Sequence, residues 1–244
     1  MINHHIHSAL AHERASTFLT EAQVRRQAKQ ARAGRRRRPV RPQSVAGGLR
    51  PQSVADGTPA VLRDGSEVLI RQVRGSDAPL LADGFARLSA RSRQMRFLSP
   101  KRSLSPAELR FLTEIDHHDH EAIGALSPAD GRGVGIARYI RDPGDPAAAE
   151  IAVTIADDWQ GRGLGSELLA QLSDRARQAG ICRFTATVSA DNVAMAGLLW
   201  KLGAKLAGRS HGTLEYEVML ESAEEYSLDS WLRHDDDGSV LAWP

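Results

Sequence analysis

The stretch DDWQGRGLGSELL (residues 157–169) decides the fold of this chain. Three glycines at alternate positions follow an apolar run and precede the apolar periodicity of a helix. The first turn of a helix presents unpaired N–H groups and the positive end of the helix dipole, and glycine lets a backbone approach an anion closely. A strand that enters a helix through such a turn therefore predicts an anion site, with phosphate as the expected ligand.

Two other glycine-rich phosphate loops do not fit this stretch. After Gly161, Gly163 and Gly165, Leu168 stands where the dinucleotide-binding fingerprint requires its last glycine. The Gly-Lys-Ser/Thr of the Walker A loop is also missing. Taken alone, the glycines also fit a plain strand-to-helix turn.

Apolar periodicity around the turn predicts a β-α-α-β-β-β-α-β-α-β order of elements. Strands are predicted at residues 67–73, 121–126, 133–140, 149–156, 182–189 and 213–220. Helices are predicted after Asp77, after Ser105 (where Glu108 completes a capping box), from the glycine turn to Gly180, and over residues 191–203. This order predicts an α/β sheet with helices on both faces.

The composition fits a globular protein, because 41% of the 244 residues are hydrophobic. The one cysteine, Cys182, excludes an internal disulfide and a multi-cysteine metal site, and it suits a reducing compartment. No run reaches the ~18 apolar residues of a membrane span, and the N-terminus lacks the apolar core of a signal peptide. We expect a cytoplasmic protein.

Charge is distributed unevenly along the chain. Residues 1–60 hold 11 Lys and Arg against 3 Asp and Glu, whereas the remaining residues hold 21 against 27. The basic segment contains RRRR (35–38) and a tandem repeat of RPQSVA (41–46 and 50–55). Such a composition cannot bury enough apolar surface to fold. It predicts a largely disordered basic arm, which is either a solvated extension or a contact for nucleic acid or another acidic partner.

The glycine turn also matches a family signature. QGRGLG (160–165) fits the Q/R-x-x-G-x-G/A pattern of the GNAT superfamily, the acyl-CoA-dependent N-acyltransferases, and a helix that begins at Asn192 and ends in KLG (201–203) resembles the same family. SARSRQMRFLSP (89–100), taken with the strand before the turn, is most similar to the catalytic domain of bacterial protein lysine acetyltransferases. The resemblance covers about residues 68–220.

This resemblance implies a fold and a division of the chain. The fold would be α/β, with a GNAT-type mixed, mostly antiparallel central sheet, helices on both faces, and the disordered basic arm before it. We assign the N-acetyltransferase domain to residues 61–222, the arm to residues 1–60 and a C-terminal extension to residues 223–244.

The resemblance also implies acetyl-CoA as co-substrate and no metal. The pyrophosphate would lie on backbone amides of the turn. The pantetheine arm would pair like an added strand with the strand before the turn, which in this fold diverges from its neighbour. The implied cofactor contacts are Thr154, Ile155, Ala156, Gln160, Gly161, Arg162, Gly163, Leu164, Gly165, Ser166 and Asn192. Asn192 equally fits a plain helix cap, and both roles can hold together.

Acetyl transfer to an amine needs the neutral amine. A lysine is protonated at pH 7, and removing its proton costs about 4.6 kcal/mol, so a base helps. The resemblance implies Glu150 as that base, although a surface carboxylate is the plain alternative. Thr187, at the position of the base in ribosomal-protein-type members, cannot serve. Leu199 replaces the tyrosine with which many members protonate the leaving thiolate, so the acid stays unassigned.

Two further clusters are weaker signals. DHHDHE (116–121) crowds three His and three acidic residues into a turn before a strand, and we predict a solvated loop there rather than a metal site. Arg91, Arg93 and Arg96 either face the phosphates of the cofactor or an acidic substrate, or form surface ion pairs.

The sequence therefore predicts an N-acetyltransferase that moves an acetyl group from acetyl-CoA to a primary amine by direct attack. The acceptor would be a protein lysine or a small amine. The alternative is a non-catalytic acyl-CoA-binding sensor that contacts nucleic acid or a partner through its Arg-rich arm. Leu199 favours the sensor slightly, and Glu150 opposes it.

Overall fold

The computed structural model describes residues 57–220 of the chain. The C-terminal extension predicted for 223–244, and nearly all of the arm predicted for 1–60, lie outside the described residues. The predicted arm overlaps the fold at its end, because strand β1 (Thr58–Val61) pairs antiparallel with β2 (Glu67–Gln72). Placing residues 58–60 in a disordered arm was therefore wrong. Pro59 argues against a strand in the sequence, because proline has no N–H to donate. An edge strand such as β1 tolerates this missing N–H.

The remaining elements follow in one chain order. The strands are β3 (His120–Leu126), β4 (Gly133–Arg141), β5 (Ala148–Ile155), β6 (Arg183–Ser189), β7 (Lys205–Ser210) and β8 (Thr213–Met219). The α-helices are α2 (Ala78–Arg87), α3 (Ala90–Phe97), α4 (Pro106–Thr113), α5 (Leu164–Gln178) and α6 (Val193–Lys201), with 3-10 turns at η1 (Gly75–Asp77) and η2 (Asp157–Trp159).

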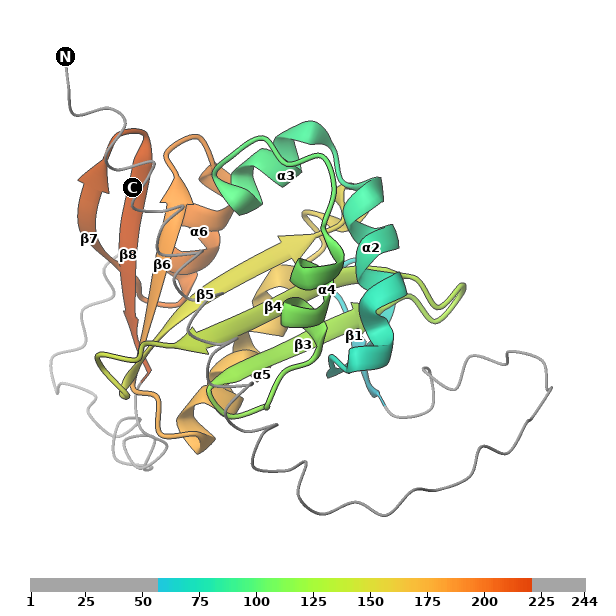
Figure 1. Cartoon of the computed structure of the whole chain (residues 1–244), viewed down its shortest axis with the longest axis horizontal. Coiled ribbons are helices and arrows are strands. Elements are labelled where there is room, and N and C mark those ends of the chain that lie inside the picture. The colour runs from blue at the N-terminus through green and yellow to red at the C-terminus, as the bar shows by residue number, and fades with distance from the viewer. Residues whose placement is uncertain (1–56, 221–244) are drawn as a thin grey trace, which may run out of the picture.

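All eight strands belong to one twisted sheet in the order β1-β2-β3-β4-β5-β6-β8-β7 (Figure 1). Every neighbouring pair is antiparallel except β5 and β6. The predicted mixed, mostly antiparallel sheet is confirmed.

The parallel pair is also the weak point of the sheet. β5 pairs with β4 over its whole length, but it pairs with β6 only at Ala148, Ala149 and Glu150. Beyond Glu150 the two strands separate, and Figure 1 shows the gap between their ribbons. We call this divergence the fork.

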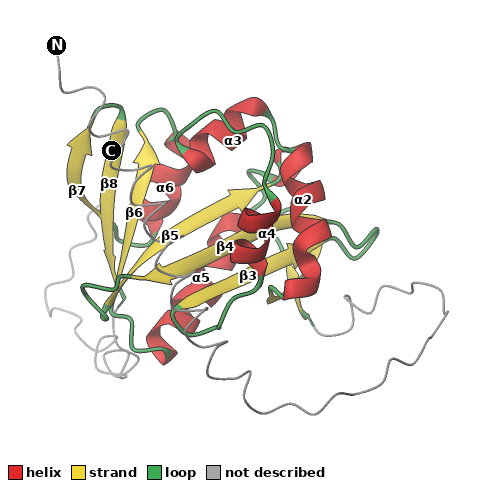
Figure 2. Ribbon diagram, viewed as in Figure 1, coloured by secondary structure: helices red, strands yellow, loops and turns green. Residues whose placement is uncertain are grey.

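Helices cover both faces of the sheet, as predicted (Figure 2). α5 packs on β3, β4 and β5, while α2, α3 and α4 lie on the opposite face. The main core lies under α5 and α6, where Leu168, Leu172, Tyr139, Phe184 and Leu199 are almost fully buried. None of the helices within residues 57–220 has the length and apolarity that a bilayer span requires.

The termini of the helices agree with their sequence signals. Ser105 Oγ accepts the Glu108 N–H while the Glu108 carboxylate accepts the Ser105 N–H, which is the expected capping box. Gly180, with a φ of 77°, follows the end of α5 in the left-handed conformation.

The predicted order of elements missed α3 and β7 as well as β1. α3 has the sequence ARSRQMRF, which offers no apolar stripe, and no residue of this helix is buried. β7 has the sequence KLAGRS, in which Gly208 marks an irregular register with β8. Both elements depend on tertiary contacts more than on their own residue pattern.

We predict that deletion of residues 1–56 leaves the domain folded, whereas deletion of residues 1–66 destabilises it. The longer deletion removes β1 and the buried Leu62, which is 6% exposed, and leaves β2 as a bare edge. The expected fall in melting temperature for the longer deletion is roughly 5–10 °C. Calorimetric melts of the two truncated proteins would contradict this if the shorter deletion already abolished the cooperative transition.

Candidate active site

The glycine turn leaves the first N–H groups of α5 open. Gly161 and Gly163 have φ values of 77° and 96°, a conformation that favours glycine, and Gly163 is the N-cap residue of α5. No side chain caps this N-terminus. Ser166, named as an amide donor from the sequence, already donates its N–H to the Gly163 carbonyl at 3.0 Å. The turn thus offers an anion the amides that precede Ser166.

Two of the glycines are also required by their neighbours. A Cβ on Gly163 would lie 3.0 Å from Nε of Arg63, and a Cβ on Gly165 would lie 3.1 Å from Cδ2 of Leu198 in α6. Gly165 therefore lets α5 and α6 pack closely as well as opening the turn. Leu164 is buried against the sheet, so it presents only its backbone to the turn.

The polar side chains of the turn hold the loop rather than face the open amides. Gln160 Nε2 donates to the Ile155 carbonyl at 3.2 Å. Arg162 donates to Ser66 Oγ and to the Asp158 carbonyl, lies 3.5 Å from Asp64, and stacks over the Trp159 ring. Arg162 thus fastens the β1–β2 hairpin to the turn.

A second guanidinium reaches the turn from Arg63, which lies in the hairpin between β1 and β2. Its backbone N–H donates to the Arg162 carbonyl at 3.2 Å, and its Nε occupies the space that a Cβ of Gly163 would need. Arg63 is exposed, and none of the ion pairs among residues 57–220 uses it. Arg63 could not be predicted from the sequence, because it is the pairing of β1 with β2 that brings it to the turn.

Two of the three residues whose backbone was expected to pair with the cofactor point toward β4 instead of the fork. Ala156 N–H donates to the Val134 carbonyl, and Ala148 accepts from Asp142 N–H across the same pair of strands. Backbone groups alternate along an antiparallel ladder, so those of Thr154 and Ala156 point toward β4. The groups that face the fork belong to residues 151, 153 and 155, so Ile155 remains a backbone candidate and Val153 joins it.

Asn192 is the N-cap residue of α6, and its Oδ1 accepts the Met195 N–H at 3.1 Å. The plain capping role is therefore confirmed. Asn192 also lines the same cavity as the glycine turn, so a contact with a cofactor stays compatible with the cap.

Glu150 lies where the fork begins. It is the last β5 residue paired with β6, opposite Thr185, and it is also paired with Ile140 of β4. It is exposed and lines a cavity of about 2220 Å³ that extends to Gly161, Gly163 and Gly165. The strand thus brings together the two features that the sequence singled out, the carboxylate at one end and the glycine turn at the other.

α3 is fastened to the loop after β5 by Asp157. The Asp157 carboxylate accepts the Ser89 N–H at 2.7 Å and the hydroxyl of Ser92. Burial opposes ionisation, but the hydrogen bonds from Ser92 and Ser89 outweigh it and lower the pKa of Asp157. This contact links Ser89 and Ser92 to the loop that precedes the glycine turn.

The three arginines of α3 have different surroundings. Arg93 donates to the carbonyls of Ala86 and Arg102, so it is structural. Arg91 is exposed, and Arg96 is half-buried and lines the cavity. Burial lowers the pKa of Arg96, while the nearby Glu150 opposes that shift.

Both tyrosines within residues 57–220 are buried, and of the two only Tyr216 also lines the cavity. Tyr139 and Tyr216 are 1% and 3% exposed and belong to the core on the α5 side. Burial, with Glu121 nearby, raises the pKa of Tyr139 to about 12. Leu199 is fully buried, so a tyrosine at this position would have to be accommodated by the core.

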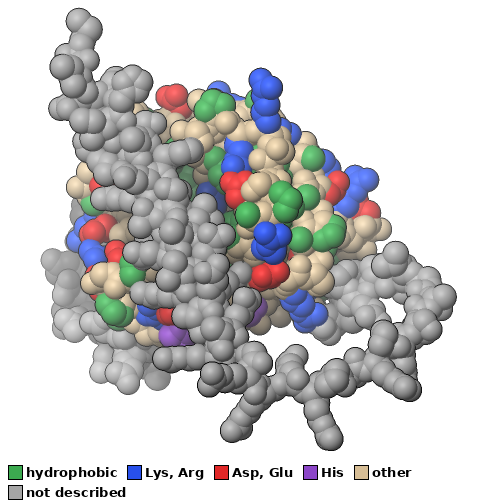
Figure 3. Space-filling model, in the orientation of Figure 1, with side chains coloured by type: hydrophobic (Ala, Val, Ile, Leu, Met, Phe, Trp, Pro, Cys, Tyr) green, Lys and Arg blue, Asp and Glu red, His purple; other side chains and the backbone are tan. Residues whose placement is uncertain are grey.

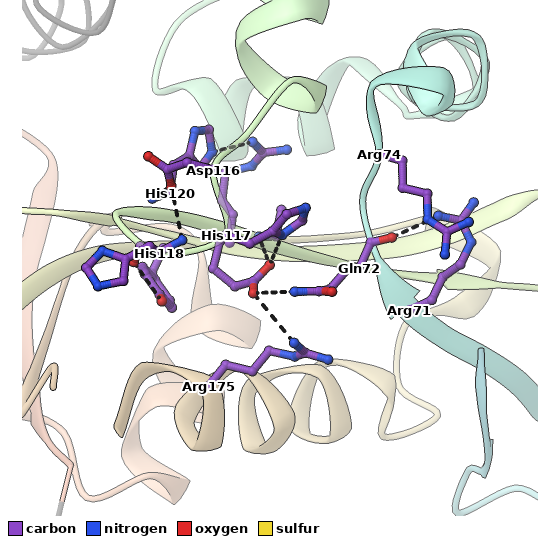
Figure 4. A network of polar contacts seen from close by, with 12 residues as sticks. Arg71, Gln72, Arg74, Asp116, His117, His118, His120 and Arg175 are labelled. Carbon is purple, nitrogen blue, oxygen red and sulfur yellow. Dashed lines mark hydrogen bonds and ion pairs between the residues drawn. The ribbon is translucent and has the colours of Figure 1, made fainter. Parts of the chain in front are cut away.

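The segment DHHDHE is a structural network, so the predicted solvated loop was wrong for Glu121 and His120, which are 2% and 9% exposed. Asp116 accepts three consecutive backbone N–H groups, and Glu121 accepts from Gln72 and contacts His117 and Arg175 (Figure 4). Within residues 57–220, no group of three or more His, Cys, Asp or Glu side chains is arranged to hold a metal ion.

The signature, the fork and the sheet order can now be compared with known proteins. Residues 67–205 match the sequence model of the acetyltransferase (GNAT) domain. The chain belongs to the GNAT acetyltransferase family. Members of this family use acetyl-CoA as acetyl donor, so the predicted family, enzyme class and donor are confirmed.

Named relatives agree with this assignment. The chain is 33% identical to acetyltransferase Pat of Mycolicibacterium smegmatis over 160 residues, which are 66% of this chain and 48% of Pat. It is 42% identical to acetyltransferase PA5475 of Pseudomonas aeruginosa over 144 residues, which are 58% of this chain and 77% of that protein. The GNAT domain of S. lividans PAT superposes with a TM-score of 0.63 at 29% identity, covering 67% of this chain and 96% of that domain. The chain thus spans about half the length of the M. smegmatis protein.

We predict that Asp157→Asn lowers the melting temperature by a few degrees at pH 7, because an amide cannot accept the bonds from both Ser89 and Ser92. The folded pKa of Asp157 is lowered, so the stabilisation is present above the unfolded value of 3.8 and is lost as pH falls through the folded value. The difference from the wild type should therefore narrow at pH 3. Asp158→Asn, next in the chain, is the control, and equal melts of the two variants at pH 7 would contradict the role of Asp157.

Proposed function

We propose that this chain transfers the acetyl group of acetyl-CoA to the side-chain amine of a protein lysine, with Glu150 as the base. The observation that carries the proposal is the fork. One strand has the carboxylate of Glu150 where the fork begins and leads to the open N-terminus of α5 at its other end. The five residues from Ile151 to Ile155 span about 17 Å. This slot suits an extended thioester arm with a phosphate at its far end.

The residues around the slot fit acetyl-CoA. The amides of Gly161–Gly165 would hold the pyrophosphate, while the backbone groups of Val153 and the N–H of Ile155 would bond to the pantetheine arm. Arg63 would supply a cation beside the phosphates, because Arg162 is engaged with Asp64 and Ser66. Bound acetyl-CoA supplies an acetyl group activated as a thioester.

Glu150 would accept the proton that the amine must lose. In the transfer, the amine nitrogen bonds to the acetyl carbon, the carbon–sulfur bond breaks, and the amine proton passes to Glu150 directly or through one water. Water would protonate the leaving thiolate, whose thiol has a pKa near 8.5 in water. This assignment fits the burial of Tyr139 and Leu199 in the core, outside the lining of the cavity.

The choice of a protein lysine as acceptor is supported by the resemblance to protein lysine acetyltransferases and by the relatives Pat and PAT. The face that carries Glu150 lies on the side of α3 and α4, where basic, acidic and apolar side chains are interspersed (Figure 3). A small amine is the second candidate. It is favoured by a 38% identity over 60 residues with an L-methionine sulfoximine/L-methionine sulfone acetyltransferase of Pseudomonas aeruginosa, a match that covers 25% of this chain.

We predict that Glu150→Gln lowers turnover by about 10²- to 10⁴-fold at neutral pH while acetyl-CoA still binds, because glutamine keeps the shape but accepts no proton. Part of the loss should return at high pH, where more of the acceptor amine is neutral. The measurement is the pH–rate profile on a lysine peptide, with Glu67→Gln on the exposed start of β2 as the control.

Two results would contradict this proposal. Wild-type turnover in Glu150→Gln would move the base elsewhere. A wild-type protein that binds acetyl-CoA and acetylates no amine would favour an acyl-CoA-binding sensor.

We predict that Arg63→Gln weakens acetyl-CoA binding about tenfold, since one charge-assisted hydrogen bond to phosphate is lost. Arg132→Gln, an exposed arginine beside Asp130, is the control. Titration calorimetry with acetyl-CoA and with dephospho-CoA separates the pyrophosphate from the 3′-phosphate. An unchanged Kd for Arg63→Gln would remove Arg63 from the site.

A further inference from the structure

The cavity next to Glu150 contains a buried cation that the transfer reaction does not use. Arg138 of β4 is 4% exposed and lines the cavity. One of its nitrogens, NH1, donates to the Leu112 carbonyl at 3.2 Å and to His120 Nε2 at 3.0 Å. No carboxylate among residues 57–220 forms an ion pair with Arg138. A buried charge without a counter-charge is costly, so an anion in this cavity would be strongly favoured.

A second guanidinium lies beside the first. Arg96 of α3 lines the same cavity and stacks over the ring of Phe97. Burial, together with the neighbouring positive charge of Arg96, lowers the pKa of Arg138 to about 9. Lys101, in the same lining, is already paired with Glu108. The two arginines therefore leave this part of the cavity with unbalanced positive charge.

The strand register places this charge next to the base. Arg138 is paired with Ala152, and Glu150 is paired with Ile140, so Arg138 and Glu150 are diagonal neighbours on one face of the sheet. Diagonal neighbours of an antiparallel pair lie about 7–8 Å apart. A molecule with an amine at Glu150 thus needs its anionic group only a few bonds away.

Glu150 cannot balance both arginines while it acts as a base. It lies near Arg96, but a carboxylate that has accepted a proton carries no charge. The two guanidinium groups would then be unbalanced at the moment when the amine is deprotonated. A carboxylate that belongs to the acceptor keeps its charge throughout the transfer.

We infer that the acceptor carries a carboxylate within one residue of its reactive amine, and that Arg138 and Arg96 bind this carboxylate while the amine faces Glu150. The inference rests on the proposed function of Glu150. Guanidinium groups match the planar, two-oxygen geometry of a carboxylate. A free amino acid and a lysine flanked by Asp or Glu share this chemistry.

The first test compares matched acceptors with the full-length wild-type protein and acetyl-CoA. One arm uses the common L-amino acids and their C-terminal amides. The other arm uses lysine peptides with Asp or Glu on either side, and the same peptides with Asn or Gln. We expect kcat/KM to be about 10- to 100-fold higher for the carboxylate member of each productive pair, the range for a hydrogen bond to a charged group. The arm with the higher kcat/KM identifies the source of the carboxylate.

The second test uses Arg138→Gln and Arg96→Gln, with Arg110→Gln on the exposed side of α4 as the control. Each of the first two variants should reduce, at least tenfold, the ratio of kcat/KM between the carboxylate member of a pair and its amide, Asn or Gln partner. The control should keep the preference. Because Arg138 is buried, Arg96→Gln gives the answer if Arg138→Gln does not fold.

The outcomes separate the inference from the proposed function. Acetylation of amines without a carboxylate preference, or a preference that survives in Arg96→Gln, overturns the carboxylate subsite alone. Loss of the preference in the variants, with Glu150→Gln slow on both members of a pair, supports both. A wild-type protein that acetylates neither the amino acids nor the lysine peptides refutes the proposed function and the subsite with it.

Discussion

The structure depends on the fact that β5 has one complete neighbour and one partial neighbour. Its pairing with β4 fixes the strand in the sheet, while its pairing with β6 stops at Glu150. Buried backbone groups need hydrogen-bond partners, so the edge from Ile151 to Ile155 requires water or a ligand to complete it. The same strand leads into the glycine turn, and the sheet thereby aligns a strand-like slot with an anion site.

The sequence predicted the parts of this arrangement that are local. A strand, three glycines and an amphipathic helix are contiguous, so residues 149–178 could be assigned with their expected roles. The positions of Arg63 beside the glycine turn and of Arg138 beside Glu150 could not be predicted, because each results from strand pairing. Of the three residues named for backbone pairing with the cofactor, Thr154 and Ala156 point toward β4 and only Ile155 faces the fork, since periodicity alone does not say which residues of a strand bond to which neighbour.

The buried charged side chains on the two faces of the sheet differ in their partners. On the α5 face, the buried carboxylate of Glu121 has Gln72 and His117 as partners and Arg175 at 3.6 Å. That network is closed, and it serves packing. On the opposite face, Arg138 has the Leu112 carbonyl and a ring nitrogen of His120 as partners. An unbalanced positive charge therefore lies on the face where Glu150 meets the cavity, and this charge is the basis of the proposed carboxylate subsite.

The β1–β2 hairpin has a consequence for how such a domain can diversify. Its first strand and its loop lie at the edge of the sheet, ahead of residues 67–205 that match the family model, and the loop touches the glycine turn through the bond from the Arg63 N–H to the Arg162 carbonyl. An edge strand has only one neighbour, so its loop can change in length or charge without disturbing the register of the other strands. The proposed contact between Arg63 and the phosphates of the donor could thus change without any change at the fork or at Glu150.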